Sequence, residues 1–333
     1  MTTTVIDKNT RAQRLVKGWR LFAASTTAAA FLFVINNFLT HAASLPGPRN
    51  PETILAWLQL LAYPATITAL ALYTLRHGSL NSDAAKLEAV AQYIPRAAFF
   101  AVLFIGIADF TLSLLHIENL SDTLLPAEIA QGIAHSQYRA QLHYPLLVIA
   151  ALVALRKRGA PFVWLTLLIV AAELLIVIAR FVFSYEQPFM GDLVRFWYAA
   201  LFLFAAAYTL KEDGHVRVDV LYAGFSPKAK ARANAAGVLL LGFPLCWTIL
   251  ALGLATRSSA VNAPILNFEI TQSSAGLHVK YFMAAFLLVF ALSMTAQFAA
   301  MLLRSVHTVI FDEDADEDAD ESADKSAPSE QTE

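Results

Sequence analysis

The sequence predicts an all-α polytopic membrane protein with about eight transmembrane helices. Hydrophobic residues make up 57% of the 333 residues, and the mean hydropathy of +0.55 is far above that of a soluble domain. Apolar stretches recur along the chain at about the length that a helix needs to cross a bilayer. Charged residues collect in the short segments between these stretches. This distribution favours membrane-spanning helices over any soluble fold class.

Each apolar stretch is taken as one span, and the segments between the spans are taken as connectors. Span four is the shortest, because a basic block at residues 156–158 ends it; it starts at about His143, or alternatively at Tyr138. Residues 76–88 read as a polar connector, and residues 117–141 as a longer connector with an amphipathic piece on the membrane surface. The predicted spans cover approximately residues 21–40, 53–75, 93–115, 143–155, 162–183, 192–210, 235–255 and 280–303.

Basic residues indicate the orientation of the chain. Lys and Arg are concentrated in residues 1–20, 76–88, 156–158 and 211–232, which alternate with connectors that hold only Arg49, Arg139 and Arg257. Because cytoplasmic connectors carry an excess of Lys and Arg, we expect both termini to be cytoplasmic.

The C-terminal segment differs from the rest of the chain. Residues 312–333 hold eleven of the 26 acidic residues and one lysine. Such a segment repels itself and has little apolar surface to bury, so we expect a disordered acidic tail. The predicted organisation is a four-span extension at residues 1–160, a four-span domain at 161–304 and a cytoplasmic tail at 305–333.

The sequence shows no motif for enzyme or cofactor chemistry. It lacks a phosphate-binding glycine loop, a metalloprotease helix motif and a nucleophile elbow. A single cysteine, Cys246, excludes an intrachain disulfide and a cysteine-based metal cluster. The histidines lie at span ends or in connectors, which does not suit a membrane haem. We therefore expect no enzyme activity and no cofactor, and we attribute the basic N-terminal segment to contact with lipid headgroups rather than nucleic acid.

Four ionisable residues stand inside predicted spans: Arg96, Asp109, Glu173 and Arg180. Such residues are costly in a bilayer and are therefore candidates for a function. Glu173 and Arg180 are seven residues apart, on one face of span five. We favour a structural role, in which these groups bond to neighbouring helices or to a partner. The alternative is an ion or proton path through Asp109 and Glu173, but the broken helices typical of sodium-coupled carriers are not evident.

The connector between spans six and seven has a distinctive sequence. It reads Gly-His-Val-Arg-Val-Asp at residues 214–219 and Phe-Ser-Pro-Lys-Ala-Lys at 225–230, where Ser226 and Pro227 suit the start of a helix. This sequence resembles the first cytoplasmic connector of the small membrane subunit, DctQ type, of TRAP transporters. These are tripartite, ATP-independent periplasmic transporters. The resemblance covers roughly residues 161–304.

The resemblance implies a subunit rather than a complete transporter. Family members are four-span units that dock against a large DctM-type permease subunit in the bacterial inner membrane. With a periplasmic substrate-binding protein, the large subunit imports an organic acid by symport with sodium ions, which it binds itself. The residues that match the family pattern are candidates for the partner interface: Arg180, Asp192, Lys211, His215, Arg217, Asp219, Glu269 and Lys280.

Residues 1–160 depart from the family pattern, because the usual small subunit lacks four additional spans. The simplest expectation is that these four spans give the large subunit additional support within the membrane. Two other functions stay open at this point. A stand-alone secondary carrier would move solute without partners, and the membrane-anchor subunit of a redox complex would hold haem.

Overall fold

The computed structural model describes residues 2–48, 51–157, 162–212, 222–270 and 276–311. All of the regular secondary structure in these ranges is helical. Eight of the helices, counted over the described ranges, are long and apolar enough to cross a membrane, which confirms the predicted number of spans. The acidic segment 312–333 and the connector residues 213–221 lie outside the described residues.

The chain alternates long spanning helices with short surface pieces. The N-terminal spans are α1 (Thr2–His41), α2 (Ile54–Arg76), α3 (Leu80–Ile117) and α6 (Ser136–Arg156), with α4 (Ser121–Leu124) and α5 (Ala127–Gly132) between the last two. The C-terminal spans are α7 (Phe162–Phe183), α8 (Pro188–Lys211), the continuous run α9 (Pro227–Gly237), η2 (Val238–Gly242) and α10 (Phe243–Gly253), and α12 (Lys280–Phe311). The 3₁₀ turn η1 (Tyr222–Gly224) and α11 (Asn262–Leu266) complete the list.

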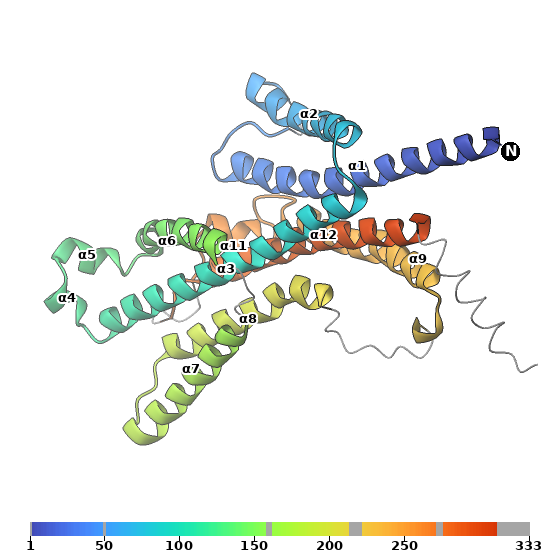
Figure 1. The fold of residues 1–333 in the computed structure, drawn as a ribbon. Helices are drawn as coiled ribbons and strands as arrows, with labels where there is room; N and C mark the ends of the chain where they lie inside the picture. The colour runs from blue at the N-terminus through green and yellow to red at the C-terminus, as the bar shows by residue number, and fades with distance from the viewer. Residues whose placement is uncertain (1, 49–50, 158–161, 213–221, 271–275, 312–333) are drawn as a thin grey trace, which may run out of the picture.

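Helices α3 and α12 form the centre of the molecule, where they run side by side (Figure 1). In α12, 67% of the residues in the most apolar stretch are buried, the highest share among the described spans. The α1–α2 pair lies on one side of this centre and the α7–α8 pair on the other (Figure 1). One apolar cluster contains residues of α3, α6, α7, α8 and α12, so helices from both halves share a core.

The connector predicted at residues 76–88 is wrong. A tight turn at Gly78, whose φ is +84°, separates α2 from α3, and the side chain of Ser79 accepts a hydrogen bond from the Ser82 amide to start α3. The polar residues that suggested a connector, Asp83 and Glu88, lie inside this helix. Both are tolerated there because each has a cationic partner on another helix.

Other helix boundaries differ less from the expectation. Helix α7 has the predicted bounds, and Ser226 caps α9 by accepting a hydrogen bond from the Ala229 amide, as expected. Helix α12 continues to Phe311, beyond the predicted end of span eight. Helix α9 continues into α10 through a wider π-helical turn, where Gly242 lies against the Phe298 ring; a Cβ there would approach the ring to 2.9 Å.

Candidate functional site

A buried ion pair joins α3 to α6 inside the membrane-spanning region. Asp109 is fully buried, and Arg139 is 1% exposed. The Nη1 atom of Arg139 donates to Asp109 Oδ1 at 3.0 Å and to the Ser113 hydroxyl at 2.7 Å. Because both charges are paired and hydrogen-bonded, this site satisfies the conditions under which a low-dielectric interior accepts an ion pair.

The same carboxylate also binds the C-terminal half. The other oxygen of Asp109, Oδ2, accepts a hydrogen bond of 2.6 Å from the backbone amide of His278. His143, on α6, lies 3.4 Å from Oδ1 through its Nε2 atom, and its Nδ1 atom is 2.8 Å from the Tyr281 hydroxyl at the start of α12. Asp109 is therefore the meeting point of α3, α6 and the segment that leads into α12. We call Asp109, Arg139, His143, His278 and Tyr281 the central cluster.

The electrostatics of the central cluster keep His278 uncharged at neutral pH. Burial, and next the positive charge of Arg139, lower the pKa of His278 from 6.5 to about 4. The negative charge of Asp109 acts in the opposite direction but does not offset them. His278 therefore adds no charge to the Asp109–Arg139 ion pair.

A second set of ion pairs links the start of α3 to α8 and α12. Glu88 is 7% exposed, and its carboxylate binds Lys211 Nζ at 3.1 Å and the guanidinium of Arg304. A hollow of about 370 Å³ adjoins these residues, with Lys230 of α9 on its far wall. Lys211, one of the predicted interface residues, is therefore also part of an internal link.

The turn between α2 and α3 is bound to α1 in a similar way. The Nε atom of Arg20 donates to Asp83 Oδ2 at 2.7 Å, and its Nη atoms donate to the backbone carbonyls of Thr74 and His77. Arg20 is 4% exposed, so its charge is neutralised and bonded within the protein. Helices α1, α2 and α3 are held together at this end by one guanidinium.

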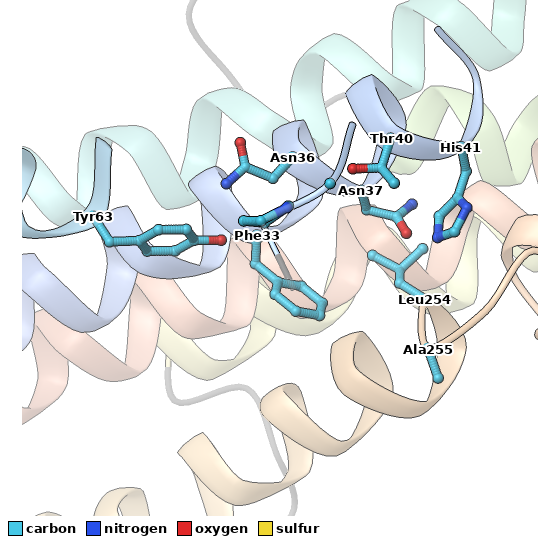
Figure 2. Close-up of a pocket in the computed structure, with 10 residues that line it drawn as sticks. Phe33, Asn36, Asn37, Thr40, His41, Tyr63, Leu254 and Ala255 are labelled. Atoms are coloured by element: carbon cyan, nitrogen blue, oxygen red, sulfur yellow. The ribbon is translucent and has the colours of Figure 1, made fainter. Parts of the chain in front are cut away.

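At the C-terminal end of α1 lies a pocket of about 170 Å³, shown in Figure 2. Asn36, Thr40 and His41 of α1 and Tyr63 of α2 surround it, with Leu254 closing the far side. Asn37 exchanges two side-chain hydrogen bonds, of 2.7 and 3.0 Å, with Asn262 of α11. The pocket is smaller than the roughly 300 Å³ at which sites for drug-sized ligands begin. Its asparagine side chains join α1 to its neighbours, Asn36 through the Gln59 carbonyl of α2 and Asn37 through Asn262.

Four of the predicted interface residues lie at or near helix ends and form ion pairs or hydrogen bonds. Arg180 Nε is 3.3 Å from Glu186, and both side chains are 58% exposed. Asp192 is buried and accepts a hydrogen bond from the Leu277 amide at 3.1 Å. Lys280 and Glu269 form an exposed pair with a distance of 2.9 Å.

The remaining predicted residues are not brought together. The Nε atom of Arg96 is buried without a hydrogen-bond partner among the described residues. The sequence predicts that Glu173 bonds to neighbouring helices or to a partner, and its side chain is exposed on α7. His215, Arg217 and Asp219 lie outside the described residues.

Sequence reasoning missed most of the central cluster. The sequence places Arg139 in a connector, or at the start of span four if that span begins at Tyr138, and it places His143 and His278 at span ends or in connectors. All three are buried around Asp109. One available signal was electrostatic, because a carboxylate in the middle of a span requires a cation nearby. In the part of the chain that the structure describes, no group of three or more His, Cys, Asp or Glu residues suits a metal ion.

Comparison with protein families accounts for the C-terminal helices. Residues 168–308 match the model of the family described as tripartite ATP-independent periplasmic transporters, DctQ component. This segment is a DctQ domain. The resemblance predicted from the connector is therefore confirmed, with slightly different limits. No curated protein and no solved structure matched the chain.

The DctQ domain begins within α7 and ends near the end of α12. DctQ components are transport components rather than enzymes. Helices α1–α6 precede the DctQ domain, and the central cluster and Glu88 connect them to it.

Proposed function

We propose that this chain is the small membrane subunit of a TRAP transporter and that it braces the large permease subunit. The large subunit would import an organic acid delivered by a periplasmic binding protein, in symport with sodium ions that it binds itself. The complex would lie in the bacterial inner membrane, with both termini of this chain in the cytoplasm. The DctQ domain is the observation that carries this proposal.

The internal ion pairs support a bracing role. A transporter that alternates its access moves one part of the protein against another part that stays fixed. The fixed part needs helices that do not shift relative to one another. Asp109 ties α3 to α6 and to the segment before α12 through buried bonds, and such bonds are little screened by salt. Glu88 adds partly exposed ion pairs to Lys211 of α8 and Arg304 of α12. The intramembrane carboxylate Asp109 therefore serves to hold helices together.

The extension enlarges this brace. Helices α1–α6 share a core with the DctQ domain instead of forming a separate body, so they would enlarge the rigid body that supports the large subunit. We infer that the four additional spans strengthen the same function and add no second transport path.

Reconstitution tests the proposal. The chain is co-expressed with the large permease subunit and the binding protein encoded by neighbouring reading frames, and a tag on this chain is used for purification. We expect the large subunit to co-purify, and liposomes with all three proteins to take up the organic acid when sodium is higher outside.

Two outcomes would contradict the proposal. Liposomes that hold this chain alone would take up an organic anion if it were a complete carrier. A haem absorption band in the purified chain would instead identify the anchor of a redox complex.

A further inference from the structure

Glu173 occupies an unusual position on α7. The helix has 22 residues, from Phe162 to Phe183, so Glu173 stands at its middle. Helix α7 is also the most hydrophobic span among the described residues, with a mean hydropathy of 2.7. The side chain of Glu173 is exposed, beside Val170 and Leu174, which are 60% and 58% exposed.

Exposed apolar side chains on a membrane helix need no protein partner. Lipid tails are as apolar as leucine, so Val170 and Leu174 are equally well placed against lipid or protein. A carboxylate at the centre of the bilayer is different, because lipid offers it neither a hydrogen bond nor a counter-charge. Glu173 is therefore the residue that indicates what covers this face.

The chain itself does not supply the missing partner. Helix α7 packs chiefly against α8, through the face that carries Leu165, Ile169 and Ala179, and it lies at the edge of the molecule beyond α8 (Figure 1). No described residue bonds to Glu173. Every buried carboxylate in the described ranges has a partner. Asp83 binds Arg20, Glu88 binds Arg304 and Lys211, and Asp109 binds Arg139. Asp192 accepts a hydrogen bond from the Leu277 amide.

We propose that the Glu173 face of α7 docks against a transmembrane helix of the large permease subunit, and that this helix carries a Lys, Arg or His side chain at mid-membrane depth. The inference rests on the proposed function and adds the location and the chemistry of the contact. A cation is favoured over a hydroxyl or amide because it removes the charge of the carboxylate as well as satisfying its oxygens.

Glu173 also sets the register of the contact. At the outer end of α7, Arg180 is already paired with Glu186 within the chain. The remaining exposed side chains of α7 are mainly apolar and permit sliding along the partner helix. The one unpaired charge therefore fixes the depth at which the two helices meet.

Photo-crosslinking of the purified complex tests the docking surface. A benzoylphenylalanine side chain replaces Val170 or Leu174 on α7, and matched controls carry it at Leu58 or Leu72, which are exposed on α2. We expect the α7 positions to crosslink to the large subunit, and the mass of the crosslinked peptide then identifies the facing helix. Crosslinks from α7 to a second copy of this chain, or to lipid alone, in an intact complex would overturn the inference while the proposed function stands. Failure of the unsubstituted chain to bind the large subunit would overturn both.

Substitution of Glu173 tests the charge. We expect Glu173→Leu to reduce the yield of co-purified large subunit about tenfold, because the partner's cation is left buried and unpaired. The same substitution leaves the thermal stability of the isolated chain unchanged, since Glu173 has no internal contact to lose; Leu72→Ala is the matched control. Reversal by Glu173→Lys, combined with an acidic residue in place of the crosslinked helix's cation, restores the yield. An unchanged yield for Glu173→Leu, or no restoration by the exchanged pair, would overturn the assignment.

Discussion

At the scale of single residues, Asp109 and Arg139 form a pair in which neither member is replaceable alone. Asp109→Asn leaves a buried guanidinium without its counter-charge, so we expect a loss of about 3–5 kcal/mol in the free energy of unfolding. The double substitution Asp109→Asn with Arg139→Met removes both charges, so it should lower the free energy of unfolding less than Asp109→Asn alone. Thermal unfolding of the detergent-purified chain, followed by tryptophan fluorescence, measures the difference.

Arg195→Gln is the control for this pair. Arg195 also binds an aspartate, Asp192, but its side chain is 77% exposed. An exposed pair contributes about 1 kcal/mol or less, so this change should be nearly neutral. If Asp109→Asn lowered the free energy of unfolding no more than Arg195→Gln does, the buried pair would not hold α3 and α6 together.

His278 gives the chain a predicted sensitivity to acid. Its pKa is about 4 when folded and 6.5 ordinarily, so the unfolded chain binds more protons between these values. The contribution of neutral His278 to the free energy of unfolding is therefore fully present above pH 6.5 and is lost as the pH falls towards 4. The charged and titratable groups around it are Arg139, Asp109, His143 and His116.

Melting temperatures measured at intervals from pH 7 to pH 4 check this expectation. His278→Gln should flatten the decline, whereas His135→Gln, at an exposed histidine, should leave it unchanged. Equal slopes for the two variants would mean that another group controls the acid response.

The sequence pointed to Asp109 but not to its partners. A charged residue in an apolar run is visible without any structure, since the bilayer makes it costly. Arg139 looked like a connector residue because the apolar run of span four is short, and only the folded α6 carries it into the membrane region beside Asp109. Such pairings join residues far apart in the chain, and hydropathy contains no information about them.

At the scale of helices, Gly106 allows α3 and α8 to approach closely. A Cβ at this position would meet Trp197 Nε1 at 2.6 Å and Leu193 Cδ1 at 3.1 Å. We expect Gly106→Leu to destabilise the chain by about 1–3 kcal/mol, because the helices must separate to admit the side chain. Gly191→Ala is the control, since no atom lies within 4 Å of its added Cβ. Melting temperatures that respond equally to both changes would contradict this close packing.

The connector between α8 and α9 is expected to contact the large subunit, as its resemblance to the family signature implies. Reversal of charge at both Arg217 and Asp219 should therefore reduce co-purification of the large subunit. Arg257→Glu, at an exposed residue predicted on the opposite side of the membrane, serves as the control. An unchanged yield of complex would count against the connector as a docking element.

Helix number and approximate position were predictable, as were the lengths of α2 and α7, while the lengths of α3 and α12 were not. A run of about twenty apolar residues is sufficient to identify a span because of the thickness of the bilayer. Helix α3 extends some three turns beyond its apolar run, since Arg20 and Arg304 satisfy the acidic residues in those turns. The wide turn of η2 next to Phe298 likewise depends on packing against α12.

At the scale of the whole molecule, polar contacts between the two halves occur at three levels along α3. Glu88 binds Lys211 and Arg304 at one end, the Trp197 indole donates to the Val102 carbonyl at 3.3 Å near the middle, and Asp109 accepts from His278 at the far level. Asn37 and Asn262 add a further link through α1. The extension and the DctQ domain are therefore expected to behave as one body in the membrane.

A cut between the halves tests this expectation. A protease site placed in the connector at residues 158–161 separates α1–α6 from α7–α12 without removing any of the contacts named above. We expect the two fragments to elute together in mild detergent and to stay together in 1 M salt, because buried pairs and apolar packing are little affected by screening. Glu88→Gln combined with Asp109→Asn should weaken the association, since each change removes the negative charge from a group that bonds across the cut. Fragments that separate without these substitutions would show that the extension is a distinct unit tethered to the DctQ domain.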